Sequence, residues 1–203
     1  YDGTSYPLVE IGDQCWFQTN LNTTTFANGD AIPLIYDAQE WLDQGNAEGA
    51  AYRTIFGDDI RSEQFDRGLL YNWYSVVDER GVCPSGFHVS SEMDWDVLES
   101  FLGSNDADPI RAQESWYENY TLNGSNSAGL SVMSQRVLIH HDGNIANNFY
   151  GTSSNGLYFS SGSRFWTSVA VSASNARTTV ISQSISSADR NKRWGFNVRC
   201  LKD

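Results

Sequence analysis

The segment GVCPSGFHVSSEMDWDVLESFLG, residues 81–103, carries the clearest helix signal in the chain. Ser91 is a good N-cap residue, and Asp94 follows three positions later, where an acid completes a capping box. Gly103 is a natural C-terminal stop. Apolar residues recur between cap and stop at helical spacing and predict one buried stripe: Trp95, Leu98, Phe101 and Leu102.

The same segment holds residue types that a metal site or a nucleophile would use. A helix brings Glu92 and Asp96 to one face near His88, but no HExxH or HxxxH spacing accompanies them. Cys83 would need a base and an electropositive setting to react as a thiolate, and the net charge of −12 is wrong for that. We therefore predict no catalytic residue and no metal ligand here.

The alternative interpretation is that the segment is scaffold. CPSGFHV then forms a turn, buries Phe87 and Val89, and leads into the capped helix. In this hypothesis Cys83 forms a disulfide with Cys200 in the last strand. Such a bridge closes a loop of more than a hundred residues and stabilises the fold by about 4–5 kcal/mol on the chain-entropy model. Cys15, the third cysteine, is left without an assigned role.

Bulk composition limits the classes of partner. The 203 residues suit one domain spanning 1–203, and the net charge of −12 argues against nucleic acid and against anionic membranes. No apolar run reaches the length of a membrane span, so no membrane insertion is predicted. No cofactor is predicted, although the acidity leaves calcium open. Because the chain begins with Tyr1, we expect it to follow a processed or omitted segment.

Cysteine usage indicates the compartment. The three cysteines are far apart, contain no CxxC spacing, and stand in a chain rich in aromatic, Ser and Asn residues. This pattern fits an oxidising environment better than the cytosol. We therefore expect an extracellular or cell-surface location, with a phage virion as the alternative.

Short strands and few helices are expected along the rest of the chain. Residues 104–163 are rich in Asn, Ser and Gly and are predicted to be mostly irregular, with a strand and turn within 130–144. Residues 69–77 are either a strand or a buried helical turn, and 186–193 are expected to be a connection. The remaining expected elements are strands within 6–12, 14–21, 164–171, 176–186 and 194–202, and a helix from Asp37 to near Gly45.

Several motifs together resemble the Fibrobacter succinogenes major paralogous domain. They are VEIGDQCWFQTNLNTTTFANGDAIPL (9–34), GLLYNWYSVVDERGVCPSGFHVSSEMDWDVLESFLG (68–103), FWTS (165–168) and NKRWGFNVRCLKD (191–203). The resemblance covers nearly the whole chain in order. It departs from the family pattern in 130–144, where a Gly-rich stretch is usual, and at Phe87 and Ser90, where Trp and Pro are commoner. It implies an exported, surface-attached or phage structural protein.

GFHVSSEMDWDVL and GFNVRC are also similar to the C-type-lectin-like fold of formylglycine-generating-enzyme relatives. That similarity implies an α+β, loop-rich fold with short antiparallel strands, one or two helices and adjacent terminal strands. The long irregular region, residues 104–163, would form the binding face. The copper-dependent oxidase activity of those relatives needs cysteines in that region, where this chain has none, so the activity is not expected here.

The favoured hypothesis is a non-catalytic adhesion or recognition module that binds a surface glycan or protein. Candidate ligand-binding residues come from the loop region and the late strands: Tyr150, Tyr158 and Trp166 for stacking, with Arg177, Asp189, Arg190 and Asn191 for hydrogen bonds to hydroxyls. Core packing is the alternative role for each aromatic residue. Two further hypotheses remain. One is a structural subunit of a virion or filament, which binds either its own kind or a scaffold protein. The other is a glycan hydrolase built on paired carboxylates, for which no acidic pair stands out.

Overall fold

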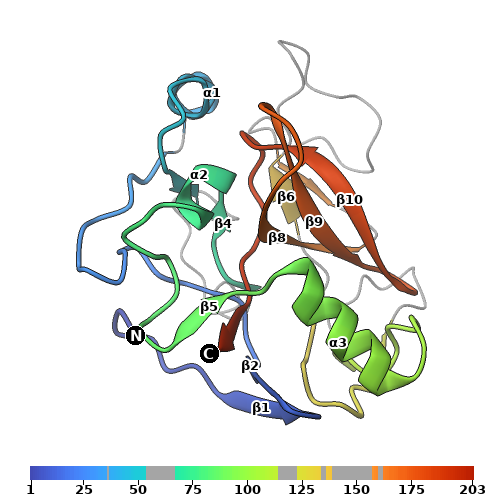
Figure 1. The fold of residues 1–203 in the computed structure, drawn as a ribbon. Coiled ribbons are helices and arrows are strands. Elements are labelled where there is room, and N and C mark those ends of the chain that lie inside the picture. Colours follow the sequence, from blue (N-terminus) through green and yellow to red (C-terminus); the bar gives the residue numbers. More distant parts are fainter. Residues whose placement is uncertain (36, 54–66, 114–122, 134–135, 139–156, 160–161) are drawn as a thin grey trace.

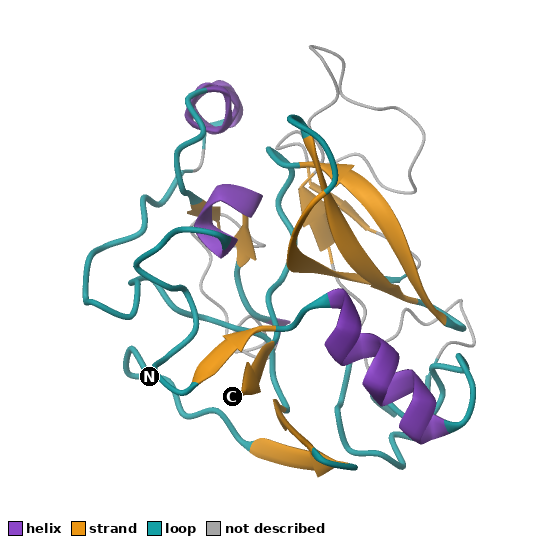
Figure 2. Cartoon of the chain, in the orientation of Figure 1, coloured by secondary structure: helices purple, strands orange, loops and turns teal. Residues whose placement is uncertain are grey.

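The computed structural model describes residues 1–35, 37–53, 67–113, 123–133, 136–138, 157–159 and 162–203. Within them the chain forms a mixed α+β fold of short antiparallel strands and short helices, as Figures 1 and 2 show. The helices are α1 (Ala38–Asn46), α2 (Trp73–Val76) and α3 (Glu92–Leu102). The strands are β1 (Leu8–Ile11), β2 (Gln14–Phe17), β3 (Tyr52–Arg53), β4 (Leu70–Tyr71), β5 (Phe87–Val89), β6 (Arg136–Leu138), β7 (Leu157–Phe159), β8 (Ser163–Ala170), β9 (Asn175–Ile181), β10 (Ile185–Asn191) and β11 (Cys200–Lys202).

The first large sheet joins the two ends of the chain in the order β1-β2-β11-β5. β1 and β2 form the expected hairpin, and Leu201 of β11 pairs with Trp16 of β2 on one side and His88 of β5 on the other. The expectation that the terminal strands lie together is therefore confirmed. Figure 1 shows both chain ends on the same side of the molecule.

The second large sheet has the order β10-β9-β8, and α3 packs across it. Trp95 and Leu98 of α3 join Phe165, Ile181 and Ile185 of the sheet in one buried cluster. The expected single strand over 176–186 is wrong, because a turn after Ile181 divides it into β9 and β10. Most of the expected connection 186–193 is strand β10, whose edge position lets it carry polar side chains that give no apolar alternation.

α3 begins and ends where the sequence predicts. Ser91 Oγ accepts the backbone N–H of Asp94, the Asp94 carboxylate accepts the N–H of Ser91, and Gly103 takes a left-handed conformation with φ 75°. The predicted stripe is wrong at Phe101, which is 60% exposed. Its ring lies against Gly12 in the β1–β2 turn. Phe101 lies on the outer side of the helix, where the contact with Gly12 leaves most of its side chain exposed.

The prediction of one or two helices is wrong, because the described residues contain three. The third is α2, a single turn that follows the two-residue strand β4 within residues 69–77. The segment is therefore strand and then helix. Asn72 separates them: its side chain accepts the N–H of Ser75 at 3.1 Å and caps the turn. α1 was expected from Asp37, and the Asp37 carboxylate caps it.

The C-terminal segment is less regular than expected. Only Cys200–Lys202 of residues 194–202 form a strand. Before it, Phe196 bridges to Tyr71 and Asn197 bridges to Phe165, so this stretch crosses between sheets. The predicted disulfide is confirmed: Cys83 and Cys200 are bonded across a sequence separation of 117. It ties the loop before β5 to the strand that β5 pairs with.

Candidate functional site

Three of the predicted polar residues lie on one face of the second sheet. Arg177 of β9 pairs in register with Asp189 of β10, and Asn191 pairs with Asn175. Side chains alternate between faces along a strand, so Arg177, Asp189 and Asn191 share the face on which α3 packs. Arg190 is directed to the opposite face. The structure thus brings together part of the predicted set and separates the rest.

A cluster of charged and polar groups centres on Arg177. Its Nε lies 2.7 Å from Asp189 Oδ1, and its Nη1 lies 2.8 Å from Glu92 Oε1 at the start of α3. Nη1 also donates to Ser187 Oγ at 3.2 Å. We call these four residues the Arg177 cluster. Ion pairs from a neighbouring strand and a helix hold the guanidinium between two carboxylates, and Glu92 and Asp189 remain partly exposed to solvent.

Sequence reasoning missed Glu92 as a member of this cluster. It stands 85 positions before Arg177, and the sequence indicates for it only a place in the first helical turn or in a metal site. Its place in the first helical turn gives a local reason for an acid, since the helix dipole is positive there. Nothing local indicates the arginine partner on β9.

Arg190 and Asn191 are engaged within the chain. Arg190 Nη1 donates to the carbonyl of Asp189 at 2.8 Å. Asn191 Oδ1 accepts the backbone N–H and the Nε–H of Arg193 at 3.0 and 3.2 Å. Across the sheet, burial and then the positive charge of Arg190 lower the pKa of Arg164 to about 10.

The proposed stacking role of Trp166 is wrong, because the residue is fully buried. Its ring packs edge-on against Phe196 with 4.8 Å between ring centroids, and its Nε1 donates to the Tyr71 carbonyl at 2.8 Å. The alternative role of core packing is the one observed. Tyr158 belongs to β7, where it pairs in register with Val137, and Tyr150 lies outside the described residues.

The charged residues of the 81–103 segment have structural partners. His88 lies between two carboxylates, with Nδ1 2.8 Å from Asp203 Oδ1 and Nε2 3.2 Å from Asp94 Oδ2. Asp94 is part of the helix cap, and Cys83 is bonded to Cys200. In the part of the chain that the structure describes, no three His, Cys, Asp or Glu side chains form a metal-binding group.

The outer face of α3 is a second feature that sequence reasoning missed. Met93, Val97 and Phe101 follow one another at intervals of four residues and are 74%, 47% and 60% exposed. We call this row the α3 ridge. The sequence predicts Phe101 in the buried stripe, and the intervals of four residues between Met93, Val97 and Phe101 are the signal that indicates an exposed row instead.

Comparison with known families identifies the chain. The family model described as Fibrobacter succinogenes major domain matches residues 9–202. The chain belongs to this family. The Fibrobacter succinogenes major domain here includes both large sheets, the Arg177 cluster, the α3 ridge and the disulfide. Searches of curated proteins and of solved structures gave no match.

One observation bears on where this Fibrobacter succinogenes major domain works. Its disulfide is consistent with an extracytoplasmic location, because such bonds persist in oxidising compartments. Among the residues that the structure describes, no helix combines the length and the apolar character that a bilayer crossing needs.

Proposed function

We propose that this domain is a non-catalytic adhesion or recognition module that binds a surface glycan or a surface protein. It would act outside the cell or at the cell surface, with a phage virion as the alternative location. We further propose that its fold is C-type-lectin-like. Family membership and the extracytoplasmic character of the disulfide support this placement.

The observation that carries the proposal is the Arg177 cluster. Planar charged groups that hold one another in place are ready to bond the hydroxyls of a ligand, because little rotamer freedom remains to be lost on binding. The cluster stands on two paired strands, and its third side comes from a capped helix. Sites on such elements keep their geometry better than sites on loops.

The absence of catalysis is part of the proposal. It is supported by the fact that the thiol and carboxylate groups that could act as nucleophile, acid or base are already bonded within the fold. Cys83 is a disulfide sulfur and not a thiol, and Asp94 is bonded within the helix cap. Glu92 neutralises Arg177 at 2.8 Å.

Binding to a glycan array tests the proposal. The purified domain is expected to retain a defined set of glycans, and Arg177→Gln is expected to weaken that binding by about tenfold or more. Arg80→Gln is the matched control, since Arg80 also joins two carboxylates, those of Asp30 and Asp78, at a separate surface. Equal retention by wild type and Arg177→Gln, or no retention at all, contradicts a glycan-binding role for the cluster.

The second candidate is a structural subunit of a virion or filament. The α3 ridge is the observation behind this candidate, because a row of exposed apolar side chains is typical of contacts with another protein, such as a scaffold protein. Electron microscopy and sedimentation of the concentrated domain test it. Filaments or defined oligomers support it, and a monomer at all concentrations contradicts self-assembly.

A further inference from the structure

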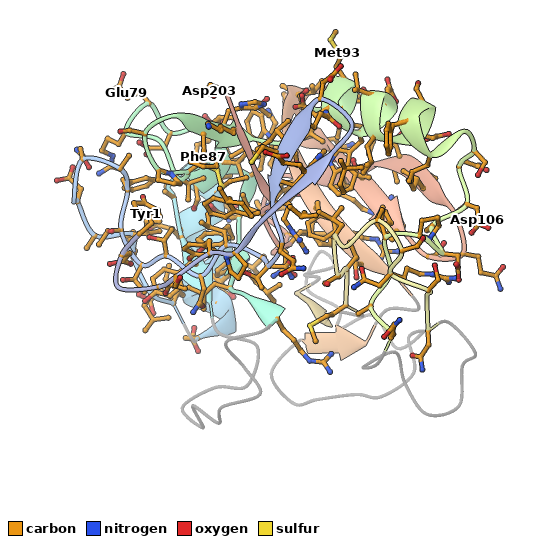
Figure 3. All side chains as sticks on the ribbon, turned by 90° about the horizontal axis from the view of Figure 1, so that it is seen from below. Tyr1, Glu79, Phe87, Met93, Asp106 and Asp203 are labelled. Carbon is orange, nitrogen blue, oxygen red and sulfur yellow. A yellow bond between two sulfur atoms is a disulfide. The ribbon has the colours of Figure 1, made fainter. Side chains whose placement is uncertain are left out.

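The α3 ridge is unusual for its continuity. Single exposed apolar residues are ordinary on protein surfaces. Here Met93, Val97 and Phe101 form one row along the outer side of a helix whose inner side is already buried. Figure 3 shows Met93 projecting away from the body of the molecule at the start of α3. A contiguous apolar row of this kind marks an interaction surface.

The ring of Phe101 is held in its exposed position. A Cβ atom added at Gly12 would lie 2.8 Å from Phe101 Cδ2, so the ring rests directly on the glycine backbone. Gly12 also has φ +60°, a conformation that few other residues adopt. The β1–β2 turn thus supports an aromatic side chain that stays 60% exposed. A fixed aromatic anchor loses little entropy when a partner covers it.

The charge beside the ridge is negative. α3 contains Glu92, Asp94, Asp96 and Glu99 and no Lys or Arg. Glu92 is paired with Arg177, and Asp94 is bonded to Ser91 and His88. Asp96 and Glu99 line a shallow hollow of about 380 Å³ with Ser100, Gly103 and Ser104. The carbonyl end of the helix dipole adds to the negative potential there.

We infer that the outer face of α3 binds a cationic amphipathic segment of a partner protein. Apolar side chains of that segment cover the α3 ridge, and a Lys or Arg enters the hollow between Asp96 and Glu99. A second copy of this chain would place the same acids against each other, and like charges at an interface are costly. This inference rests on the proposed function in its protein-binding form and names the chemistry of the partner.

The test titrates the full chain with a synthetic Leu/Lys peptide about five helical turns long, with Leu along one face. A scrambled peptide of the same composition and a Leu/Glu peptide are the peptide controls. The chain has two methionines, Met93 and Met133, so methyl-labelled protein gives one signal on the ridge and one away from it. We expect the Met93 methyl resonance to shift, the Met133 resonance to stay, and neither control peptide to bind.

Variants locate the binding. Phe101→Ser and the pair Asp96→Asn with Glu99→Gln are each expected to weaken binding by about tenfold. Met93→Ser is the second apolar variant, since its exposed side chain can be changed without affecting the core. Val171→Ser removes an exposed apolar side chain elsewhere and is expected to change nothing. Phe101→Ser is expected to leave retention on the glycan array unchanged, because Phe101 lies outside the Arg177 cluster, and this separates the inference from the glycan-array result.

Several outcomes overturn the inference. One is a Met93 resonance that does not move, or peptide binding that Phe101→Ser and Met93→Ser leave intact. Equal binding of the scrambled peptide would show that amphipathicity is not required. Equal binding of the Leu/Glu peptide would show that positive charge is not required. A concentration-dependent dimer that Phe101→Ser abolishes assigns the ridge to a second copy. Binding of phosphatidylcholine vesicles that Phe101→Ser abolishes assigns it to a lipid surface.

Discussion

Arg199 and Asn20 form a buried pair although 179 positions separate them in the sequence. Asn20 Oδ1 accepts Nη2–H of Arg199 at 2.6 Å and Nε–H at 3.1 Å. Nη1 donates to three backbone carbonyls, those of Phe17, Gln18 and Leu130. Burial lowers the pKa of Arg199 to about 9, so the guanidinium stays charged at neutral pH. One side chain thus joins the end of β2, the 123–133 segment and the C-terminal segment.

Replacing Arg199 should destabilise the fold. Arg199→Met leaves Asn20 Oδ1 and the three carbonyls without these donors, and we expect a loss of about 2–4 kcal/mol in the free energy of unfolding. Arg199→Lys is expected to recover only part of it, because an ammonium lacks the planar fork that reaches all four acceptors. Chemical denaturation measures both. Arg190→Met on the edge strand is the control, with an expected change within about 0.5 kcal/mol. Equal effects at the two positions would contradict a stabilising role for the buried hydrogen bonds of Arg199.

The disulfide should account for a large share of stability. Replacing both Cys83 and Cys200 by Ala is expected to lower the free energy of unfolding by about 4–5 kcal/mol, because the unfolded chain gains the freedom of a loop of 117 residues. Cys15→Ala is the matched control, since Cys15 is a free cysteine. Denaturation curves with and without reductant measure the effect. A reductant that leaves the wild-type midpoint unchanged would show that the bond contributes little.

Tyr71 should make the domain sensitive to alkali. Complete burial raises the pKa of its phenol well above 10, and its hydroxyl donates to the Thr23 carbonyl at 2.8 Å and accepts the Thr23 N–H at 2.9 Å. The unfolded chain therefore loses this proton at a lower pH than the folded chain. The stabilising contribution is complete below pH 10 and falls as the pH rises further.

Tyr71→Phe tests this pH dependence. At neutral pH the variant is expected to lose about 1–3 kcal/mol, since the two Thr23 groups lose their partner. Above pH 10 its stability should fall less steeply than that of wild type, because the buried phenol is gone. Tyr74→Phe serves for comparison, since Tyr74 is only partly buried and its pKa is raised less far from the ordinary range. Parallel curves for wild type and Tyr71→Phe would exclude the buried phenol as the source.

Gly12→Ala should reveal the contact with Phe101. The new Cβ would lie 2.8 Å from the ring, and φ +60° is unfavourable for alanine, so we expect a loss of about 1–2 kcal/mol. In a Phe101→Ala background the steric part disappears and only the backbone part remains. A double-mutant cycle measures that coupling. Strictly additive effects of the two changes would mean that the ring moves aside freely.

The parts of the fold that the sequence predicted are those with local causes. Ser91, Asp94 and Gly103 bound a helix through contacts within a few residues, and Asp37 does the same for α1. The hairpin of β1 and β2 follows from a two-residue turn between apolar stretches. Three cysteines alone allow three pairings. The disulfide was predicted from the hypothesis that a bridge ties the segment before the helix to the last strand, and the structure confirms it.

The parts that the sequence did not predict depend on distant partners. The sequence around Trp166 does not predict whether its side chain is exposed or buried. The side chain is buried against Tyr71 and Phe196, which are distant in the sequence. β10 carries polar residues because it lies at a sheet edge, a position that only the folded topology defines. Glu92 and Arg177 are 85 positions apart, so the local sequence around either residue does not predict their ion pair.

The Cys83–Cys200 bond also determines how this chain would yield under tension. A force applied to the two ends cannot extend the 117-residue loop while the bond is intact. The bond therefore prevents about 400 Å of contour length from being extended. Only the N-terminal portion ahead of Cys83 and the last few residues can be drawn out. With the bond intact, full extension would therefore stop at about 300 Å, the reach of the 82 residues before Cys83 and the three after Cys200, and reduction would release the further length of about 400 Å.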